Sequence, residues 1–305
     1  MSTAGRIVVF NKMKQDLVLG CIQNYQWQQI SPFVNSLLDA DFKGEICFLT
    51  RAIDEATAAQ MRQRKITLRP ITQKTSTRET HPRSRYWRKT RFAPMWFRRW
   101  LFKRYCSLSS MRHFAYQEFL QHHGAGYRQI FIIDVGDVVF QTNPFGGPPA
   151  QGLHCFEEWA GHTLASEPCN AWWLATLFGE DVLGELGANT ILCAGSMLGD
   201  PETLLDLFNR TTRILPTVRA ILDSGDQACF NVTIRREGGL HAHIHKNGDT
   251  VFTMGIMPET EIHLNPAGQV VNAENRVIPV LHQFNRHPAW QGRIAVLRKW
   301  LPERV

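Results

Sequence analysis

Residues Tyr127 to Phe145 have the sequence YRQIFIIDVGDVVFQTNPF. The apolar run from Ile130 to Ile133 is too short for a helix and rich in β-branched residues, which indicates a strand buried on both faces. Two carboxylates, Asp134 and Asp137, follow this strand directly. Because an unpaired buried carboxylate is costly, we expect a cation or a hydrogen-bond network to compensate them.

The position of the two carboxylates indicates what they bind. Ligands of open α/β sheets bind at the carboxyl ends of the strands. Carboxylate oxygens suit Mg²⁺ or Mn²⁺ shared with a diphosphate. The alternative is a pair of aspartates that caps a turn, and the spacing of Asp134 and Asp137 alone does not separate these two interpretations.

Composition places the chain among ordinary globular proteins. It has 305 residues, of which 44% are hydrophobic and 20% charged, enough for one large α/β domain or two small ones. No apolar run reaches the ~18 residues of a membrane-spanning helix, and the apolar core of the N-terminus is too short for a signal peptide. Four of the seven cysteines lie in apolar, strand-like runs. They are Cys21, Cys47, Cys155 and Cys193.

The cysteine pattern predicts a reducing, cytoplasmic location. Thiols in strand-like runs are typical of buried free cysteines in a reducing compartment. The sequence contains no CxxC pair, so a structural zinc site is not expected.

The chain before the central stretch alternates between strand and helix patterns. Strands are expected at 16–22, 44–49 and 65–71. Helices are expected at 30–38, with Ser31 as N-cap, and at 54–64. This alternation predicts a parallel sheet with crossover helices. No GxGxxG or GxxxxGK motif follows any of these strands, so a dinucleotide fold or a P-loop is not supported.

Further polar positions follow predicted strands and helices. Gln23, Asn24 and Tyr25 follow the first strand, where they form either a site for a base or ribose or a plain polar loop. Arg112 lies on a helix expected at 108–122, where it either meets a diphosphate or belongs to a solvated face.

The second half of the chain changes in character. A strand at 190–199 contains Gly195 and Ser196, and Gly195 either admits a close ligand or marks a β-bulge. Helices are expected near 174–186 and at 202–210. After SGDQACFN, which begins at Ser224, the chain becomes β-rich up to His282.

The segment from Arg78 to Arg104 is basic and aromatic. It carries ten Lys or Arg residues against one acid, Glu79. Such a segment forms either an interfacial helix on anionic lipid or an insertion whose aromatic rings fold onto the domain.

Four ordered motifs between Asp16 and His287 resemble those of the GT-A class of glycosyltransferases of the bacterial, nucleotide-diphosphate-sugar-dependent type. FIIDVGDVVFQTNPF resembles their strand, DxD-type motif and following F-x-x-N/D-P-F. CAGSMLG resembles their strand of small residues beside the donor, and SGDQACFN resembles their D-Q-x-x-x-N helix start. IPVLHQFNRHP resembles a C-terminal His motif that supplies a metal ligand in some retaining members. The carboxylates form D-x-x-D rather than D-x-D, which leaves the roles of Asp134 and Asp137 open.

The resemblance implies a single GT-A domain over residues 1–305: a Rossmann-like, mostly parallel central sheet flanked by helices, a β-rich C-terminal part and an insertion at about 78–106. The implied cofactor is Mn²⁺ or Mg²⁺, and the implied reaction is hexosyl transfer to a glycan or a lipid-linked, cell-envelope type of acceptor. Metal ligands would be Asp134, Asp137 and His282. Donor-binding residues would be Gln23, Asn24, Tyr25, Arg112, Asp134, Gly195 and Ser196. The catalytic candidates, at the transferred sugar, would be Asp226 and Gln227, and the alternative for Asp226 is an N-cap at the helix start.

Two questions stay open at the level of sequence. Glu157, Glu158 and Asp226 are equal candidates for a base, so retention and inversion are not separated. A different class of function is a catalytically inactive GT-A-fold module that docks on an anionic membrane or on nucleic acid. For an enzyme we expect no nucleic-acid partner, but attachment to the inner face of the membrane through residues 78–104.

Overall fold

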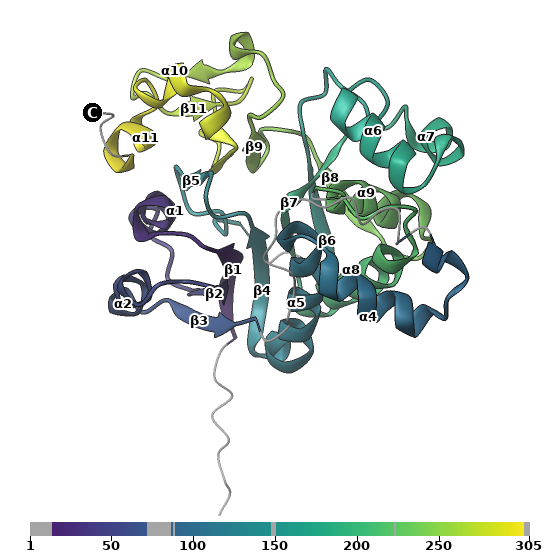
Figure 1. Cartoon of the computed structure of the whole chain (residues 1–305). Helices are drawn as coiled ribbons and strands as arrows, with labels where there is room; N and C mark the ends of the chain where they lie inside the picture. Colours follow the sequence, from purple (N-terminus) through teal and green to yellow (C-terminus); the bar gives the residue numbers. More distant parts are fainter. Residues whose placement is uncertain (1–13, 72–86, 88, 148–150, 223, 302–305) are drawn as a thin grey trace, which may run out of the picture.

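A seven-stranded sheet with the strand order β3-β2-β1-β4-β7-β6-β8 forms the centre of the computed structural model, which describes residues 14–71, 87, 89–147, 151–222 and 224–301 (Figure 1). Its strands are β1 (Gln15–Gln23), β2 (Glu45–Arg51), β3 (Thr67–Pro70), β4 (Tyr127–Ile133), β6 (Leu153–Glu157), β7 (Leu192–Gly199) and β8 (Ala242–His245). Strands β3, β2, β1 and β4 are parallel, and β7 is antiparallel to both of its neighbours. The prediction of a mostly parallel α/β sheet is confirmed.

Helices cover both faces of this sheet. The helices of the described residues are α1 (Trp27–Asp39), α2 (Glu55–Gln63), α4 (Met95–Tyr105), α5 (Leu108–His123), α6 (Pro168–Leu177), α7 (Glu180–Leu186), α8 (Pro201–Ile214), α9 (Asp226–Arg236), α10 (Pro288–Gln291) and α11 (Ala295–Trp300), of which the last two pack in the C-terminal part instead. Alternation along β4 explains the two layers, because successive side chains point to opposite faces. Ile130 and Ile132 pack with residues of α5 and α8, whereas Phe131 and Ile133 pack with residues of α1. The predicted burial of this strand on both faces is confirmed.

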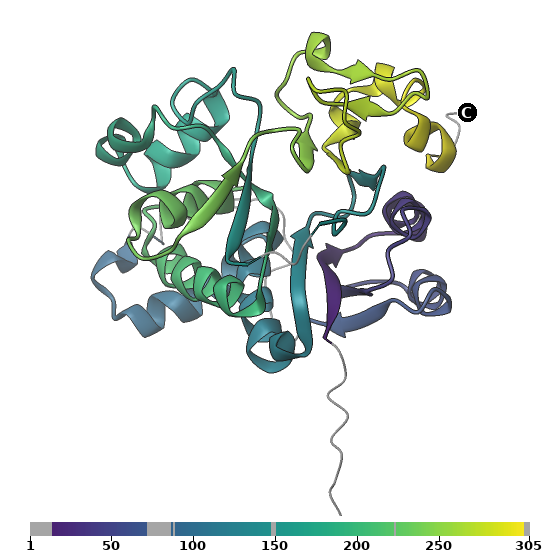
Figure 2. The ribbon, with the colours of Figure 1, turned by 180° about the vertical axis from the view of Figure 1, so that it is seen from behind.

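Two small sheets lie beyond the carboxyl end of β4. One has the order β5-β12-β9 and contains β5 (Val138–Phe140), β12 (Val280–His282) and β9 (Val251–Thr253). The other pairs β10 (His263–Leu264) with β11 (Val270–Val271). Both views place the C-terminal segment that ends in α11 next to α1, and Lys299 forms an ion pair with Asp39 there (Figures 1 and 2). The expected β-rich C-terminal part is therefore present, and it packs back on the first helix.

Two helix predictions need correction. Helix α1 begins at Trp27 rather than after Ser31, and Pro32 lies inside it. Proline cannot donate to the carbonyl of Gln28, and the Ser31 hydroxyl donates to that carbonyl instead at 3.3 Å. The predicted helix at 174–186 is two helices, because Gly179 has φ +111° and separates α6 from α7.

Part of the basic aromatic insertion is described by the structure. Residues 72–86 and 88 lie outside the described residues, whereas Trp87, a short 3₁₀ turn at Thr90–Phe92 and α4 lie within them. Within the described ranges, no helix combines the length and the apolar character needed to cross a membrane.

Candidate metal and donor site

The turn between β4 and β5 presents the two carboxylates. The backbone N–H of Asp134 donates to the carbonyl of Gly195 in β7 at 2.8 Å, which fixes the start of this turn. Gly136 lies against Tyr25, since a Cβ at this position would be 2.6 Å from the Tyr25 hydroxyl. A larger residue at this position would displace the tyrosine ring, so glycine allows the turn and Tyr25 to lie in contact.

His282 reaches the same turn from the far end of the chain. In β12 it pairs with Val138 of β5 on one side and with Thr253 of β9 on the other. Its Nε2 lies 3.7 Å from Asp134 Oδ2 and 3.8 Å from Asp137 Oδ1. The expectation that Asp134, Asp137 and His282 lie together is met by this geometry, and one ligand atom from each lies within 4.8 Å of the others.

The surroundings of His282 orient its ring. Nδ1 lies 3.6 Å from Cys193 Sγ and 3.4 Å from Thr253 Oγ1. Nε2 is buried and, among the described residues, has no hydrogen-bond partner. A buried nitrogen of this kind is costly unless something binds it.

These residues fit a divalent cation. Metal–ligand distances of about 2.1 Å place neighbouring ligand atoms roughly 3.0 Å apart and opposite ones roughly 4.2 Å apart. The two distances from His282 Nε2 to the carboxylates fall between these values. The set of two carboxylates and one imidazole suits Mn²⁺, and Gly195 provides the space, because a Cβ there would be 2.4 Å from Asp134 Oδ2.

The strand pairing is also irregular near Gly195, where a β-bulge was the alternative interpretation. The pairing of β6 with β7 shifts register between Cys155 and Glu157, opposite the stretch of β7 that contains this glycine. The two interpretations of Gly195 are therefore compatible.

Arg112 connects the carboxylates of two elements. Its guanidinium forms an ion pair with Asp134, donates to Asp226 Oδ2 at 2.7 Å and donates to the carbonyl of Ala194 at 3.3 Å. The side chain is only 13% exposed. The alternative of a solvated helix face is wrong, because α5 turns Arg112 toward the carboxyl end of β4.

The two metal-ligand candidates differ in their electrostatics. Burial raises the pKa of Asp134, but Arg112 and His282 lower it more, so that its net pKa lies below the ordinary value. The pKa of Asp137 is raised, because burial outweighs the opposing effect of His282. Asp137 is thus the carboxylate whose charge the protein compensates least.

Asp226 and Gln227 lie at the start of α9, as predicted. Burial opposes the charge of Asp226, but Arg112 and His113 lower its pKa well below the usual range. A carboxylate of this kind is a weak proton acceptor, which favours a positioning role over that of a base. Gln227 accepts from the N–H of Ala194 at 3.4 Å and donates to Asn170 Oδ1 at 3.0 Å, and its side chain is partly exposed.

Three of the other predicted donor residues lie at the end of β1, and Ser196 lies inside β7. Gln23 ends β1, and its Oε1 is buried without a hydrogen-bond partner in the described chain. Asn24 is exposed with φ +57°. Tyr25 lies beside the aspartates, and its pKa is raised by burial and by Asp137. Ser196 fits its predicted role least, since it is fully buried.

Four residues at this site were not predicted as site residues from the sequence. His113 lies 3.6 Å from Asp226, and Cys193 and Thr253 contact the ring of His282. Asn170 accepts a hydrogen bond from the Gln227 side chain. Only Cys193 carried a usable signal, because it lies two positions from Gly195 and so faces the same side of β7.

The environment of Glu158 differs from that of the other two base candidates. It is buried, and burial raises its pKa to about 7 while His282 and Gln227 oppose this rise. By contrast, Glu157 accepts a hydrogen bond from Thr190. Of the three base candidates, Glu158 has a pKa suited to proton transfer near neutral pH.

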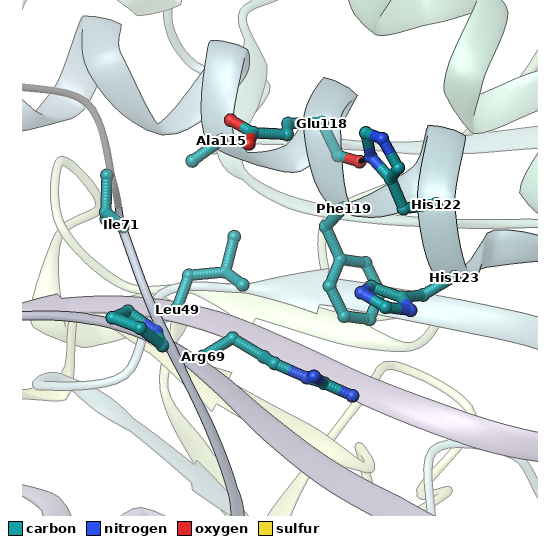
Figure 3. A pocket seen from close by; sticks show the side chains of 9 residues that line it. Leu49, Arg69, Ile71, Ala115, Glu118, Phe119, His122 and His123 are labelled. Carbon is teal, nitrogen blue, oxygen red and sulfur yellow. Dashed lines mark hydrogen bonds between the residues drawn. The ribbon is translucent and has the colours of Figure 1, made fainter.

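A separate pocket of about 320 Å³ lies between the ends of β2 and β3 and helix α5 (Figure 3). Its polar lining includes Arg69, Glu118, His122 and His123, and Phe119 and Leu49 lie among them in the view. No predicted site residue lines it, so it is distinct from the aspartate–histidine cluster.

Comparison with solved structures identifies the fold. The bifunctional glycosyltransferase WbbM, in its apo form, aligns over 93% of this chain with a TM-score of 0.50 and 10% sequence identity. The chain spans about half of that protein's length, since 50% of the WbbM chain is covered.

Core-mannan synthase A (CmsA/Ktr4) from Aspergillus fumigatus, in an Mn/GDP form, aligns over 77% of this chain and 73% of its own, with a TM-score of 0.43 and 9% identity. No protein-family model and no curated protein matches the chain in sequence. The likeness to WbbM, together with the sheet order and the flanking helices, establishes that the chain has a GT-A-like glycosyltransferase fold.

Proposed function

We propose that the chain is a metal-dependent glycosyltransferase that moves a sugar from a nucleotide-diphosphate-sugar donor to a glycan or lipid-linked acceptor. The observation that carries the proposal is the cluster of Asp134, Asp137 and His282, whose ligand atoms lie within 4.8 Å of one another. The cluster lies at the carboxyl end of β4, which is the edge where open α/β sheets bind ligands.

The chemistry of sugar transfer matches this arrangement. Mn²⁺ or Mg²⁺ held by the three residues would neutralise the negative charge that grows on the diphosphate as the sugar leaves. Arg112 is proposed to position Asp134 and to add positive potential near the donor. Asp226, which Arg112 also holds, is proposed to orient the start of α9.

The remaining residues have proposed contacts with the donor and the transferred sugar. Gln23, Asn24 and Tyr25 are proposed to contact the base or ribose at the end of β1. The partly exposed amide of Gln227 is proposed to contact a hexosyl group. The C-terminal His motif resembles that of retaining members and favours retention of configuration.

The test is direct binding of nucleotide. We expect Asp137→Ala to weaken Mn²⁺-dependent binding of a nucleoside diphosphate by more than about 100-fold in calorimetry, because a metal ligand is lost. The matched control is Asp181→Ala, which removes a carboxylate that is 74% exposed in α7. Unchanged affinity in Asp137→Ala, with the native melting temperature, would show that this carboxylate does not hold a metal.

The alternative of an inactive binding module makes a different prediction. An inactive site is expected to have its carboxylates fully neutralised by the protein's own cations. Within the described residues, Arg112 pairs with Asp134 and Asp226, whereas Asp137 faces His282 beyond hydrogen-bond distance. This incomplete neutralisation favours the enzyme.

A further inference from the structure

A patch of large apolar side chains is exposed on and just before α4. Among the described residues, seven large hydrophobic side chains are exposed, and four of them lie within nine residues of each other: Phe92, Met95, Trp96 and Trp100. Phe92 is 83% and Trp96 is 72% exposed. A contiguous cluster of this kind is typical of an interaction surface, whereas single exposed apolar residues need no explanation.

The opposite face of α4 anchors the helix to the domain. The guanidinium of Arg98 donates to the carbonyls of Pro216 and Val218 at 3.0 Å each and lies 4.5 Å from the centroid of the Trp87 ring. The indole of Trp87 donates to the same Val218 carbonyl at 2.7 Å, and the ring of Phe102 packs against the Trp87 ring. The exposed rings are therefore presented by a helix whose inner face is fixed.

This geometry revises the role of the basic residues. Arg98 is buried, and Arg99 and Lys103 lie over the ring of Phe114 at 5.7 and 4.8 Å. Arg91 and Arg104 are exposed at the two ends of the patch. No aspartate or glutamate occurs in the sequence between Glu79 and Glu118, so neither α4 nor the turn before it carries an acidic side chain.

We propose that this surface, Phe92, Met95, Trp96 and Trp100 with Arg91 and Arg104, docks on an anionic lipid bilayer. Aromatic side chains settle at the headgroup level of a membrane, and cations beside them bind anionic headgroups. Single-stranded nucleic acid needs a track of cations along the rings, and three of the cations of α4 point toward the protein instead. The inference goes beyond the transfer reaction and does not depend on it.

Docking here brings the candidate site near the membrane. Trp100 and Arg112 are joined by the last part of α4, a two-residue turn and the start of α5. From the rise of a helix and the reach of an extended chain, this backbone path is at most about 25 Å. Arg112 contacts Asp134, so a lipid-linked acceptor at the bilayer surface is within reach of the site.

The experiment uses the full chain and sedimentation with vesicles. The two vesicle types are phosphatidylcholine alone and phosphatidylcholine mixed with phosphatidylglycerol. We expect the native protein to bind only the mixed vesicles, and binding to weaken in high salt because the attraction is screened. Trp96→Ser combined with Trp100→Ser should lower the partition coefficient more than about tenfold, and Arg91→Glu combined with Arg104→Glu should do so by a similar factor.

Matched controls are available elsewhere on the surface. Trp172→Ser removes an indole that is 57% exposed in α6, and Arg213→Glu reverses an exposed cation in α8. Both should bind mixed vesicles like the native protein, and all variants should keep the native melting temperature, since only exposed side chains change. Absence of vesicle binding, equal loss in the controls, or binding of a single-stranded oligonucleotide that depends on Trp96 and Trp100 without any binding of vesicles would each overturn the proposal.

Discussion

Two polar clusters meet at the carboxyl end of β4 and differ in how their charge is compensated. In the first, Arg112 joins Asp134 and Asp226, and His113 lies beside Asp226. In the second, His282 faces Asp134 and Asp137 at 3.7 and 3.8 Å. Burial raises the pKa of Asp226, but the Arg112 guanidinium lowers it more, so that its net pKa lies below the ordinary value. The pKa of Asp137, in contrast, is raised by burial.

The difference between the two clusters supports the proposed ligand site. The two clusters share Asp134 and together contain three carboxylates and one guanidinium. In the first cluster both carboxylates pair with the same guanidinium, which is why we assign this cluster a structural role. The second cluster holds two carboxylates around His282, whose buried Nε2 has no hydrogen-bond partner within the described chain, and for this reason we propose it as the cation site.

The largest effect is expected from a substitution that removes the cation of the first cluster. Arg112→Met leaves Asp226 buried without its guanidinium, and we expect the free energy of unfolding to fall by about 3–5 kcal/mol, as for a buried ion pair that loses one partner. Urea denaturation at neutral pH measures this change. Asp137→Ala serves as the comparison, because it removes a carboxylate that burial disfavours. Equal destabilisation by both variants would contradict the distinction between scaffold and ligand site.

The second prediction concerns the imidazole of the second cluster. We expect His282→Ala to weaken Mn²⁺-dependent binding of a nucleoside diphosphate by about 100-fold, or about 2.7 kcal/mol, since a nitrogen ligand is lost. Higher Mn²⁺ concentrations should restore part of the binding by mass action. Calorimetry at two Mn²⁺ concentrations measures both effects. A loss of folding stability without any change in metal dependence would identify His282 as a core histidine instead.

The sequence predicted the parallel half of the fold well because its signals are local. In β1, β2 and β4, short apolar runs carry both the strand pattern and the burial on two faces. The Asp134–Asp137 turn followed from the same pattern, since polar residues directly after a buried strand need a partner. The start of α1 was predicted too late in the sequence, because proline usually occupies the first position of a helix. Here Pro32 lies inside the helix, and the Ser31 hydroxyl donates to the carbonyl of Gln28, to which proline cannot donate.

The site beyond the two aspartates depends on contacts that spacing does not encode. His282 came only from a resemblance, and its pairing with Val138 and Thr253 is long-range. For Arg112 the sequence allowed either a contact with a diphosphate or a solvated helix face. The direction of its side chain, which α5 turns toward the carboxyl end of β4, excludes the solvated face. The composition of residues 78–104 predicted a basic and aromatic segment, but not which of its side chains are exposed. The sequence does not show that Arg98 is buried and Trp96 exposed.

The smallest expected effect concerns Glu158, which lies beside the second cluster. Its pKa is raised from 4.5 to about 7 by burial, with His282 opposing the rise. Between these two values the folded protein holds a proton that the unfolded chain has released, so the free energy of unfolding should decrease as the pH rises from about 4.5 to 7. Glu158→Gln cannot titrate and should remove this slope, which we expect to amount to on the order of 1–2 kcal/mol. Urea denaturation across this pH range with a metal chelator present measures it, and the exposed Glu261→Gln is the control. If Glu158→Gln kept the native slope, another group would carry the titration, and the second cluster would lose its candidate base.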